Sequence, residues 1–134
     1  MPRVMIIENP TKPLWFTKKL LSLINFETVF ETGNGYEAVE KYPLIKPDFV
    51  ILDLKLAKND GLTVLKEIKK INPKSKVIVI TSSCDQKTYS ELVDNGSYTV
   101  LKIPFTVPDF LTLVTRKDLT YEEDSAVSPL ILED

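Results

Sequence analysis

The sequence predicts a (βα)5 doubly wound α/β domain, which is a five-stranded parallel sheet with helices on both faces. Five short runs rich in β-branched and aromatic residues recur along the 134 residues, and segments with apolar residues at helical spacing separate them. Three of the five runs are continuously apolar, as parallel strands covered on both faces should be. Strands that alternate with helices in this way are joined by right-handed crossovers, which place helices on both sides of the sheet.

The expected strands differ in polarity, and this difference predicts their places in the sheet. They are the runs VMII (4–7), FETVFE (26–31), DFVILDL (48–54), KVIVITS (76–82) and YTVLKI (98–103). The apolar stretches VMII, FVIL and VIVI are typical of central strands. FETVFE alternates between polar and apolar residues, and YTVLKI carries Lys102, so these two strands are expected nearer the edges.

Five helices are expected between and after these strands, because apolar residues recur there at helical spacing. The apolar residues that define the five helices are, in chain order, Leu20, Leu21, Leu23 and Ile24; Ala38 and Val39; Leu62, Leu65, Ile68 and Ile71; Leu92 and Val93; and Phe110, Leu113 and Val114. The resulting arrangement is flavodoxin-like. Any ligand site should therefore lie at the carboxyl ends of the central strands, near the point where the strand order reverses.

Length and composition exclude several classes of protein. A chain of 134 residues with 43% hydrophobic content has the size of one domain with one substantial core. No apolar run approaches the roughly 18 to 20 residues of a membrane span, and VMII is too short for a signal peptide, so a cytoplasmic protein without a membrane partner is expected. The lone Cys84 predicts a free thiol. The absence of histidine excludes Ser-His and Cys-His catalysis and argues against a zinc site.

Charge is unevenly distributed, and this predicts a domain at residues 1–117 followed by an acidic tail at 118–134. The tail holds six acidic residues and no basic ones, whereas the rest of the chain holds 17 basic and 13 acidic residues. The tail is either a solvated, frayed end or a segment for autoinhibition or partner docking. The positive charges of the domain are scattered and lack interleaved aromatic residues, so no nucleic-acid partner is expected.

Polar residues stand where four of the five expected strands end. They are Glu8-Asn9 after the first strand, Asp53 at the end of the third, Thr81-Ser82 at the end of the fourth and Lys102 near the end of the fifth. Parallel strands bring these ends to one rim of the sheet, where carboxylate and amide oxygens form a cluster of the kind that Mg²⁺ binds. Asp53 can then attack phosphorus to form an acyl phosphate, while Thr81 and Lys102 hold the phosphoryl oxygens.

Each of these residues also has a structural interpretation. Aspartate, threonine and serine at strand ends often cap the helix that follows, which applies to Asp53, Thr81 and Ser82. Glu8-Asn9 by itself is ordinary loop polarity. The functional interpretation depends on the joint placement of these side chains on three adjacent central strands.

Two further motifs lie in the loops beside these strand ends. TGNGYEAVE resembles an "A-x-D-G-x-E-A-L" opening of a second helix, and DLKLAKNDGL resembles "D-x-x-M-P-x-x-D-G". Both patterns belong to the receiver domain of two-component response regulators, which the chain resembles over about residues 3–117. The second motif has Asp53 and Gly61 at the family spacing, so the resemblance implies that Asp53 is the phosphoryl acceptor.

The resemblance also implies roles for the other residues at the rim. Mg²⁺ would be held by Asp53, by Glu8 and Asn9 in the places of the family's acidic pair, and by the backbone carbonyl of Lys55. Thr81 would be the switch hydroxyl, with Ser82 and Lys102 as further phosphoryl-binding residues. By the same resemblance, the partner face is formed by the fourth helix, the fifth strand and the fifth helix, with Tyr89, Tyr98 and Val100 as exposed contacts.

The function implied is that of a stand-alone response regulator similar to the chemotaxis regulators. It would accept a phosphoryl group from a sensor histidine kinase or a phosphotransfer protein and signal by binding a downstream protein, as a monomer or weak homodimer. It would not be an enzyme, apart from slow autodephosphorylation. The alternative is a degenerate receiver that binds its partner without phosphorylation. A small nucleotide-binding enzyme is a third possibility, but the first loop, ENPTKP, has no glycine-rich cradle for phosphates.

The chain departs from the family pattern in four places. Asn9 leaves the acidic pair with one carboxylate fewer, which predicts weak binding of Mg²⁺. Ala57 replaces the usual proline after the acceptor, which loosens that loop. The family's fifth strand reads "G-A-x-x-Y-L-x-K-P-F", and without a gap this places Ile103 at the lysine position and Val100 at the position of the switch aromatic.

Lys102 therefore has two interpretations. In the gap-free register it faces opposite to residue 103 and points away from the phosphoryl site. A β-bulge near Ile103 would instead turn the lysine stem back over the rim. We expect the second arrangement, in which Lys102 reaches the site.

Overall fold

Strands and helices alternate along the chain as predicted. The computed structural model describes residues 1–9, 15–56, 60–82, 84–103 and 105–115. Its elements are β1 (Arg3–Ile7), α1 (Trp15–Leu23), β2 (Glu27–Thr32), α2 (Gly35–Ile45), β3 (Phe49–Asp53), α3 (Gly61–Ile71), β4 (Val77–Thr81), α4 (Gln86–Asp94), β5 (Thr99–Lys102) and α5 (Val107–Thr115). In these parts of the chain, every helix is too short or too polar to cross a membrane.

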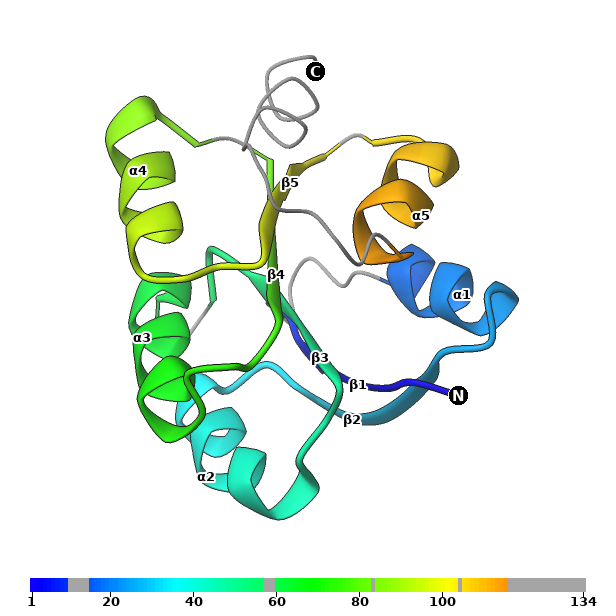
Figure 1. The fold of residues 1–134 in the computed structure, drawn as a ribbon, viewed down its shortest axis with the longest axis horizontal. Coiled ribbons are helices and arrows are strands. Elements are labelled where there is room, and N and C mark those ends of the chain that lie inside the picture. The colour runs from blue at the N-terminus through cyan, green and yellow to red at the C-terminus, as the bar shows by residue number, and fades with distance from the viewer. Residues whose placement is uncertain (10–14, 57–59, 83, 104, 116–134) are drawn as a thin grey trace.

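The five strands form one parallel sheet in the order β2-β1-β3-β4-β5 (Figure 1). The predicted fold class is confirmed, and so is the placement of FETVFE and YTVLKI, because β2 and β5 are the two edge strands. Strand β1 lies between β2 and β3, so the strand that follows it in sequence is on one side and the next strand is on the other. The carboxyl ends of β1 and β3 therefore lie next to each other at the point where the strand order reverses.

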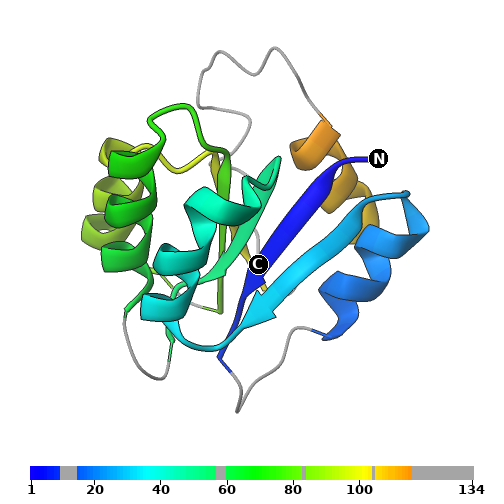
Figure 2. The ribbon, with the colours of Figure 1, turned by 90° about the horizontal axis from the view of Figure 1, so that it is seen from below.

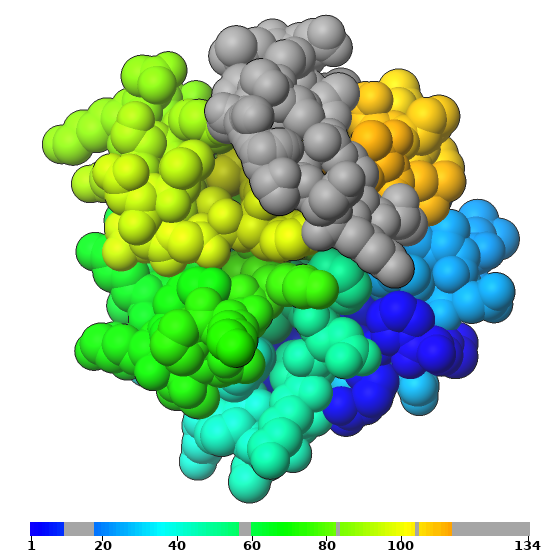
Figure 3. All heavy atoms as spheres, in the orientation of Figure 1, coloured from blue at the N-terminus to red at the C-terminus, as the bar shows by residue number. Residues whose placement is uncertain are grey.

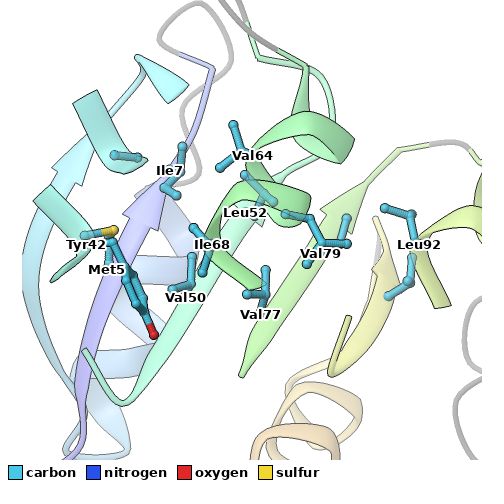
Figure 4. Packing of buried hydrophobic residues seen from close by; sticks show 13 residues of the cluster. Met5, Ile7, Tyr42, Val50, Leu52, Val64, Ile68, Val77, Val79 and Leu92 are labelled. Atoms are coloured by element: carbon cyan, nitrogen blue, oxygen red, sulfur yellow. The ribbon is translucent and has the colours of Figure 1, made fainter. Parts of the chain in front are cut away.

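Two layers of helices cover the sheet (Figure 2). Helices α1 and α5 lie on one face, and α2, α3 and α4 lie on the other. Because side chains alternate along a strand, each central strand contributes to both cores: Leu52 packs towards α2, α3 and α4, whereas Ile51 packs towards α1 and α5. Figure 4 shows the first of these cores, to which the three central strands contribute Met5, Ile7, Val50, Leu52, Val77 and Val79.

Among the apolar residues of the expected helices whose burial the structure describes, three do not face the core. Leu23 is 71% exposed, Val93 49% and Ile71 43%. Leu23 and Ile71 end their helices. Val93 follows the buried Leu92, and one residue rotates a side chain by about 100° around the helix axis, which turns it away from the sheet.

Gly61 holds the loop after β3 close to α3. Its backbone N–H donates a 2.8 Å hydrogen bond to the carbonyl oxygen of Leu54, the residue that follows Asp53. A Cβ atom at Gly61 would lie 2.7 Å from the Leu54 Cα and 2.9 Å from the Asp53 carbonyl oxygen. These are backbone atoms, so the close approach requires glycine.

We expect Gly61→Ala to lower the free energy of unfolding by about 1 to 3 kcal/mol, because the new methyl group forces the Asp53–Leu54 backbone outward. Urea denaturation measures this change. Lys66→Ala, at an exposed position of the same helix, is the matched control and should alter stability by less than about 0.5 kcal/mol. Equal stability of the two variants would show that the backbone of Asp53 and Leu54 moves at little cost to make room for the methyl group.

Candidate functional site

The parallel register brings the polar strand ends together at one rim of the sheet. Ile7 pairs with Leu52, so Glu8 lies level with Asp53. Asp53 pairs with Ile80 on β4, and Thr81 pairs with Lys102 on β5. Residues that are 21 to 45 positions apart on neighbouring strands thus come from β1, β3, β4 and β5 to one edge, as expected for parallel strands.

Backbone N–H groups hold the carboxylate of Asp53. Its Oδ1 atom accepts a 3.0 Å hydrogen bond from the N–H of Lys55, and its Oδ2 atom accepts a 3.3 Å bond from the N–H of Asn9. The Asn9 side chain completes the arrangement, because its Nδ2 atom donates a 3.1 Å bond to the carbonyl oxygen of Lys55. The loops after β1 and β3 are therefore joined directly at the half-buried Asp53.

Three of the expected cation ligands meet in this arrangement. The Asp53 carboxylate, the Lys55 carbonyl and the Asn9 amide supply oxygen donors of the kind that Mg²⁺ takes together with water. The Asn9 amide presents its NH₂ group to the Lys55 carbonyl, so it must turn to offer its oxygen to a cation. Glu8 is half-buried beside them, and its N–H donates to Thr32 at the end of β2.

The donor set fits a weakly held ion. Across the part of the chain that the structure describes, no group of three or more histidine, cysteine, aspartate or glutamate side chains is placed to hold a metal. With one amide and one carbonyl among the donors, charge contributes little to affinity for a hard cation.

Thr81 and Ser82 lie at the rim beside Asp53, and neither caps a helix. Thr81 is 2% exposed at the end of β4, and Ser82 is exposed directly after it. The N-caps of α3 and α4 are Asp60 and Asp85, whose carboxylates accept hydrogen bonds from backbone N–H groups one turn into each helix. Asp53, Thr81 and Ser82 are therefore not the N-caps of the helices that follow their strands.

The end of β5 follows a regular register. Thr81 pairs with Lys102, and the N–H of Ile103 continues the ladder with a 2.7 Å hydrogen bond to the Thr81 carbonyl oxygen. The expected bulge is absent from these described pairs of β4 and β5, so the expectation that a bulge turns Lys102 over the rim is wrong. Ile103 packs against the α1 and α5 core, and Lys102 is half-buried and faces the same side as Val100, towards α4.

Lys102 on that side lines an open cavity of about 500 Å³ next to the rim. The other lining residues are Leu54, Lys55, Cys84, Asp85 and Thr88. Burial raises the pKa of the Cys84 thiol, and the Asp85 carboxylate raises that pKa further, whereas the Lys102 ammonium lowers it. The thiol is thus a free but weakly acidic group, as expected for the lone cysteine.

The expected partner contacts are not all exposed. Val100 is 0% exposed, so the expectation that it is an exposed contact is wrong: it lies in the core beneath α3 and α4 because β5 is covered on that face. Tyr89 is half-buried against the same core. Tyr98 is half-buried before β5, far from the rim, and packs edge-on against Phe49 with ring centroids 6.0 Å apart. Figure 3 shows α3 and α4 side by side on one face of the molecule.

Sequence reasoning missed the helix caps and the cavity. The caps have a local signal, because Asp60 and Asp85 are each followed three residues later by a threonine whose N–H they accept. The cavity has no such signal, since its lining comes from three segments of the chain. Ala57, Pro104 and the tail at 118–134, with its proposed boundary, lie outside the described residues.

Comparisons with known proteins show the family to which this chain belongs. A sequence profile of the response regulator receiver domain matches residues 4–115. The chemotaxis protein CheY of Thermotoga maritima is 33% identical over 103 residues, which are 77% of this chain and 86% of that protein. CheY of Bacillus subtilis is 30% identical over 114 residues, which are 85% of this chain and 95% of that protein.

A solved structure shows the same fold. The structure of the CheX–CheY–BeF₃–Mg²⁺ complex from Borrelia burgdorferi matches with a TM-score of 0.77 and 24% identity, over 84% of this chain and 85% of that one. Together with the strand order and the placement of Asp53 at the rim, the profile match and the CheY relatives show that this chain belongs to the response regulator receiver domain family.

Proposed function

We propose that this protein is a phosphorylation-driven switch in which Asp53 accepts a phosphoryl group and the change is read by a partner protein. The observation that carries the proposal is the Asp53 carboxylate, half-buried at the carboxyl end of a central strand and held by the N–H groups of Asn9 and Lys55. A carboxylate with its orientation set by backbone groups is prepared for nucleophilic attack. The donor is a sensor histidine kinase or a phosphotransfer protein in the cytosol.

The reaction transfers one phosphoryl group between two proteins. An Asp53 carboxylate oxygen attacks the phosphorus of a phosphohistidine, an O–P bond forms, and the P–N bond breaks with its electron pair remaining on the imidazole nitrogen. Thr81 ends β4, the strand next to β3, and its hydroxyl would bind the new phosphoryl oxygens. Lys102 ends β5, one strand further away, and its ammonium would join them only if its long stem turns back to the rim. Asp53, Asn9 and the Lys55 carbonyl would hold a magnesium ion, whose charge would offset the repulsion between the two anions.

The protein signals rather than turning over a substrate. Hydrolysis of the aspartyl phosphate would be a slow return to the resting state, so the output is a protein contact on the side formed by α4 and β5. The Borrelia CheY relative was solved in complex with CheX, which supports a protein partner here.

A second candidate function is an adaptor that binds its partner without phosphorylation. The Asn9 amide favours it, because this side chain donates a hydrogen bond to the Lys55 carbonyl oxygen and would bring no charge to a cation site. Formation of an acyl phosphate distinguishes the two functions.

Incubation with acetyl phosphate and Mg²⁺ should add about 80 Da to the intact protein, the mass of one phosphoryl group. Asp53→Ala should abolish the adduct, because the attacking oxygen is removed. Asp94→Asn, at an exposed position on α4, is the control and should leave it unchanged. Full modification of the Asp53 variant would place the acceptor elsewhere, and no adduct on the parent protein would favour the adaptor.

Asn9→Asp should strengthen Mg²⁺ binding from the millimolar range by about tenfold, because it replaces an amide oxygen with a charged one. Without Mg²⁺ the same variant should be less stable than the parent by about 1 to 2 kcal/mol, since it loses the bond to Lys55 and adds a carboxylate beside Asp53. Thermal unfolding at increasing Mg²⁺ concentration measures both effects. Asn9→Ala is the control, and equal stabilisation of the two variants by Mg²⁺ would remove residue 9 from the ion's ligands.

Lys102→Met should slow phosphorylation by at least about tenfold, because the variant keeps the aliphatic stem and loses the charge that binds phosphoryl oxygens. Ile103→Ala should leave the rate nearly unchanged and cost about 1 to 2 kcal/mol of stability, since Ile103 packs against the α1 and α5 core. Time courses of intact mass measure the phosphorylation rate of each variant, and urea denaturation measures its stability. A slow Ile103 variant with a normal Lys102 variant would reverse the assignment.

A further inference from the structure

Four lysines stand close together in the sequence where α3 leads into β4. The run KKINPKSK (69–76) contains all four and no acidic residue. It covers the end of α3, the turn that follows and the residue before β4. Because β4 begins here and ends at the rim beside Asp53, this run lies at the opposite edge of the sheet, where the parallel strands start.

Three of these lysines have no carboxylate partner within the described part of the chain. Lys70 is the exception, because its Nζ atom lies 3.3 Å from Oε2 of Glu67. We define the lysine edge as the other three, Lys69, Lys74 and Lys76. Lys74 and Lys76 are exposed, and Lys69 is half-buried.

Neutral groups hold two of the cations of the lysine edge. The Nζ atom of Lys69 donates a 2.8 Å hydrogen bond to the carbonyl oxygen of Ser75, and burial lowers the pKa of Lys69. The Nζ atom of Lys76 lies 5.4 Å from the centroid of the Phe49 ring and 5.9 Å from that of the Tyr98 ring, which is a cation–π arrangement. These contacts position the ammonium groups without neutralising them, so the lysine edge presents fixed positive charge.

Helix α5 returns the chain to this same edge. It starts after the carboxyl end of β5 and runs antiparallel to the strands, so Thr115 at its end lies at the edge where the strands begin. Figure 2 shows α5 beside the start of β1. Lys76 is on the same face of the sheet as α5, because the Phe49 ring that it contacts belongs to the core packed against α1 and α5.

The residues that follow α5 carry the complementary charge. Residues 118–124, DLTYEED, hold four of the six acidic residues of the tail and no basic one. Counted from Thr115, Asp118 can lie up to about 10 Å away and Asp124 up to about 30 Å. A sheet of five strands is about 19 Å wide, so these acids can reach any point of the edge. Charge and reach together favour this segment as the occupant of the lysine edge.

We propose that the acidic segment 118–124 binds the lysine edge of the same chain. Its carboxylates pair with the exposed ammonium groups of Lys74 and Lys76 and lie close to that of Lys69. Because this edge is opposite to the rim, the bound segment leaves Asp53 open to a phosphoryl donor. An acidic partner of the lysine edge would have to displace the segment. The inference needs no phosphoryl group, so it stands or falls separately from the proposed function.

Carbodiimide coupling of the full chain tests this contact. The reagent joins a carboxylate and an amine through an amide bond without a spacer, so it links groups that are in contact, and peptide mass spectrometry locates the links. At about 0.1 M salt, links from segment 118–124 to Lys74 and Lys76 should exceed those to Lys66 and Lys87, which are exposed on α3 and α4, by about fivefold or more. Salt at about 1 M shortens the Debye length from about 10 Å to about 3 Å and should reduce the links to the lysine edge by about threefold or more.

Two variants of the full chain separate this segment from the charge of the tail as a whole. Replacing three acids near α5, as Glu122→Gln, Glu123→Gln and Asp124→Asn together, should shift the backbone amide NMR signals of residues 74–76. The matched control is Glu133→Gln with Asp134→Asn, which removes charge at the far end of the tail and should leave these signals in place.

Each outcome either supports or overturns the docking. Links within one molecule that concentrate at the lysine edge, together with amide signals that move only in the first variant, support it. Equal coupling of the segment to all exposed lysines, or no coupling to the lysine edge, overturns it. Preferred coupling to Lys55 overturns it in favour of a tail that covers the phosphorylation site. Links between two molecules, with a yield that falls on dilution, overturn it in favour of a second copy of the chain as the occupant.

Discussion

Parallel pairing of three apolar strands places every polar group of this site. Strands β1, β3 and β4 are covered by helices on both faces, and most of their side chains lose all contact with water. A slip of one residue in β3 would draw Asp53 into the core or move Leu52 to the rim, and both changes are costly. The apolar residues thus determine the register, and the register determines which polar residues meet at the carboxyl ends.

The Asp53 carboxylate is oriented mainly by backbone groups. The N–H groups of Asn9 and Lys55 donate hydrogen bonds to the two carboxylate oxygens of Asp53. The N–H of Gly61 donates a hydrogen bond to the carbonyl oxygen of Leu54, the residue after Asp53. Asn9 adds one side-chain bond, because its amide joins the loops through the Lys55 carbonyl, and it gives the proposed cation site less negative charge than a carboxylate would.

The register of the edge strand β5 determines which face of the sheet each of its last side chains lies on. A regular register turns Val100 and Lys102 towards α4 and Ile103 towards α1 and α5. Val100, which stands where the family pattern has an aromatic residue, is a smaller side chain buried in the core. Lys102, at the end of the strand, lines the cavity beside α4.

Local patterns in the sequence determined the fold class, the edge positions of β2 and β5, and the arrival of Asp53 and Thr81 at one rim, because strand polarity and helical spacing depend on neighbouring residues. Tertiary structure alone decided the burial of Val100, the direction of Lys102 and the cavity around Cys84. It also decided the bond between Asn9 and Lys55, which are separated by 46 positions. Such contacts depend on how elements distant in sequence pack against each other, and the alternation of one strand cannot encode what its neighbours bring to either face.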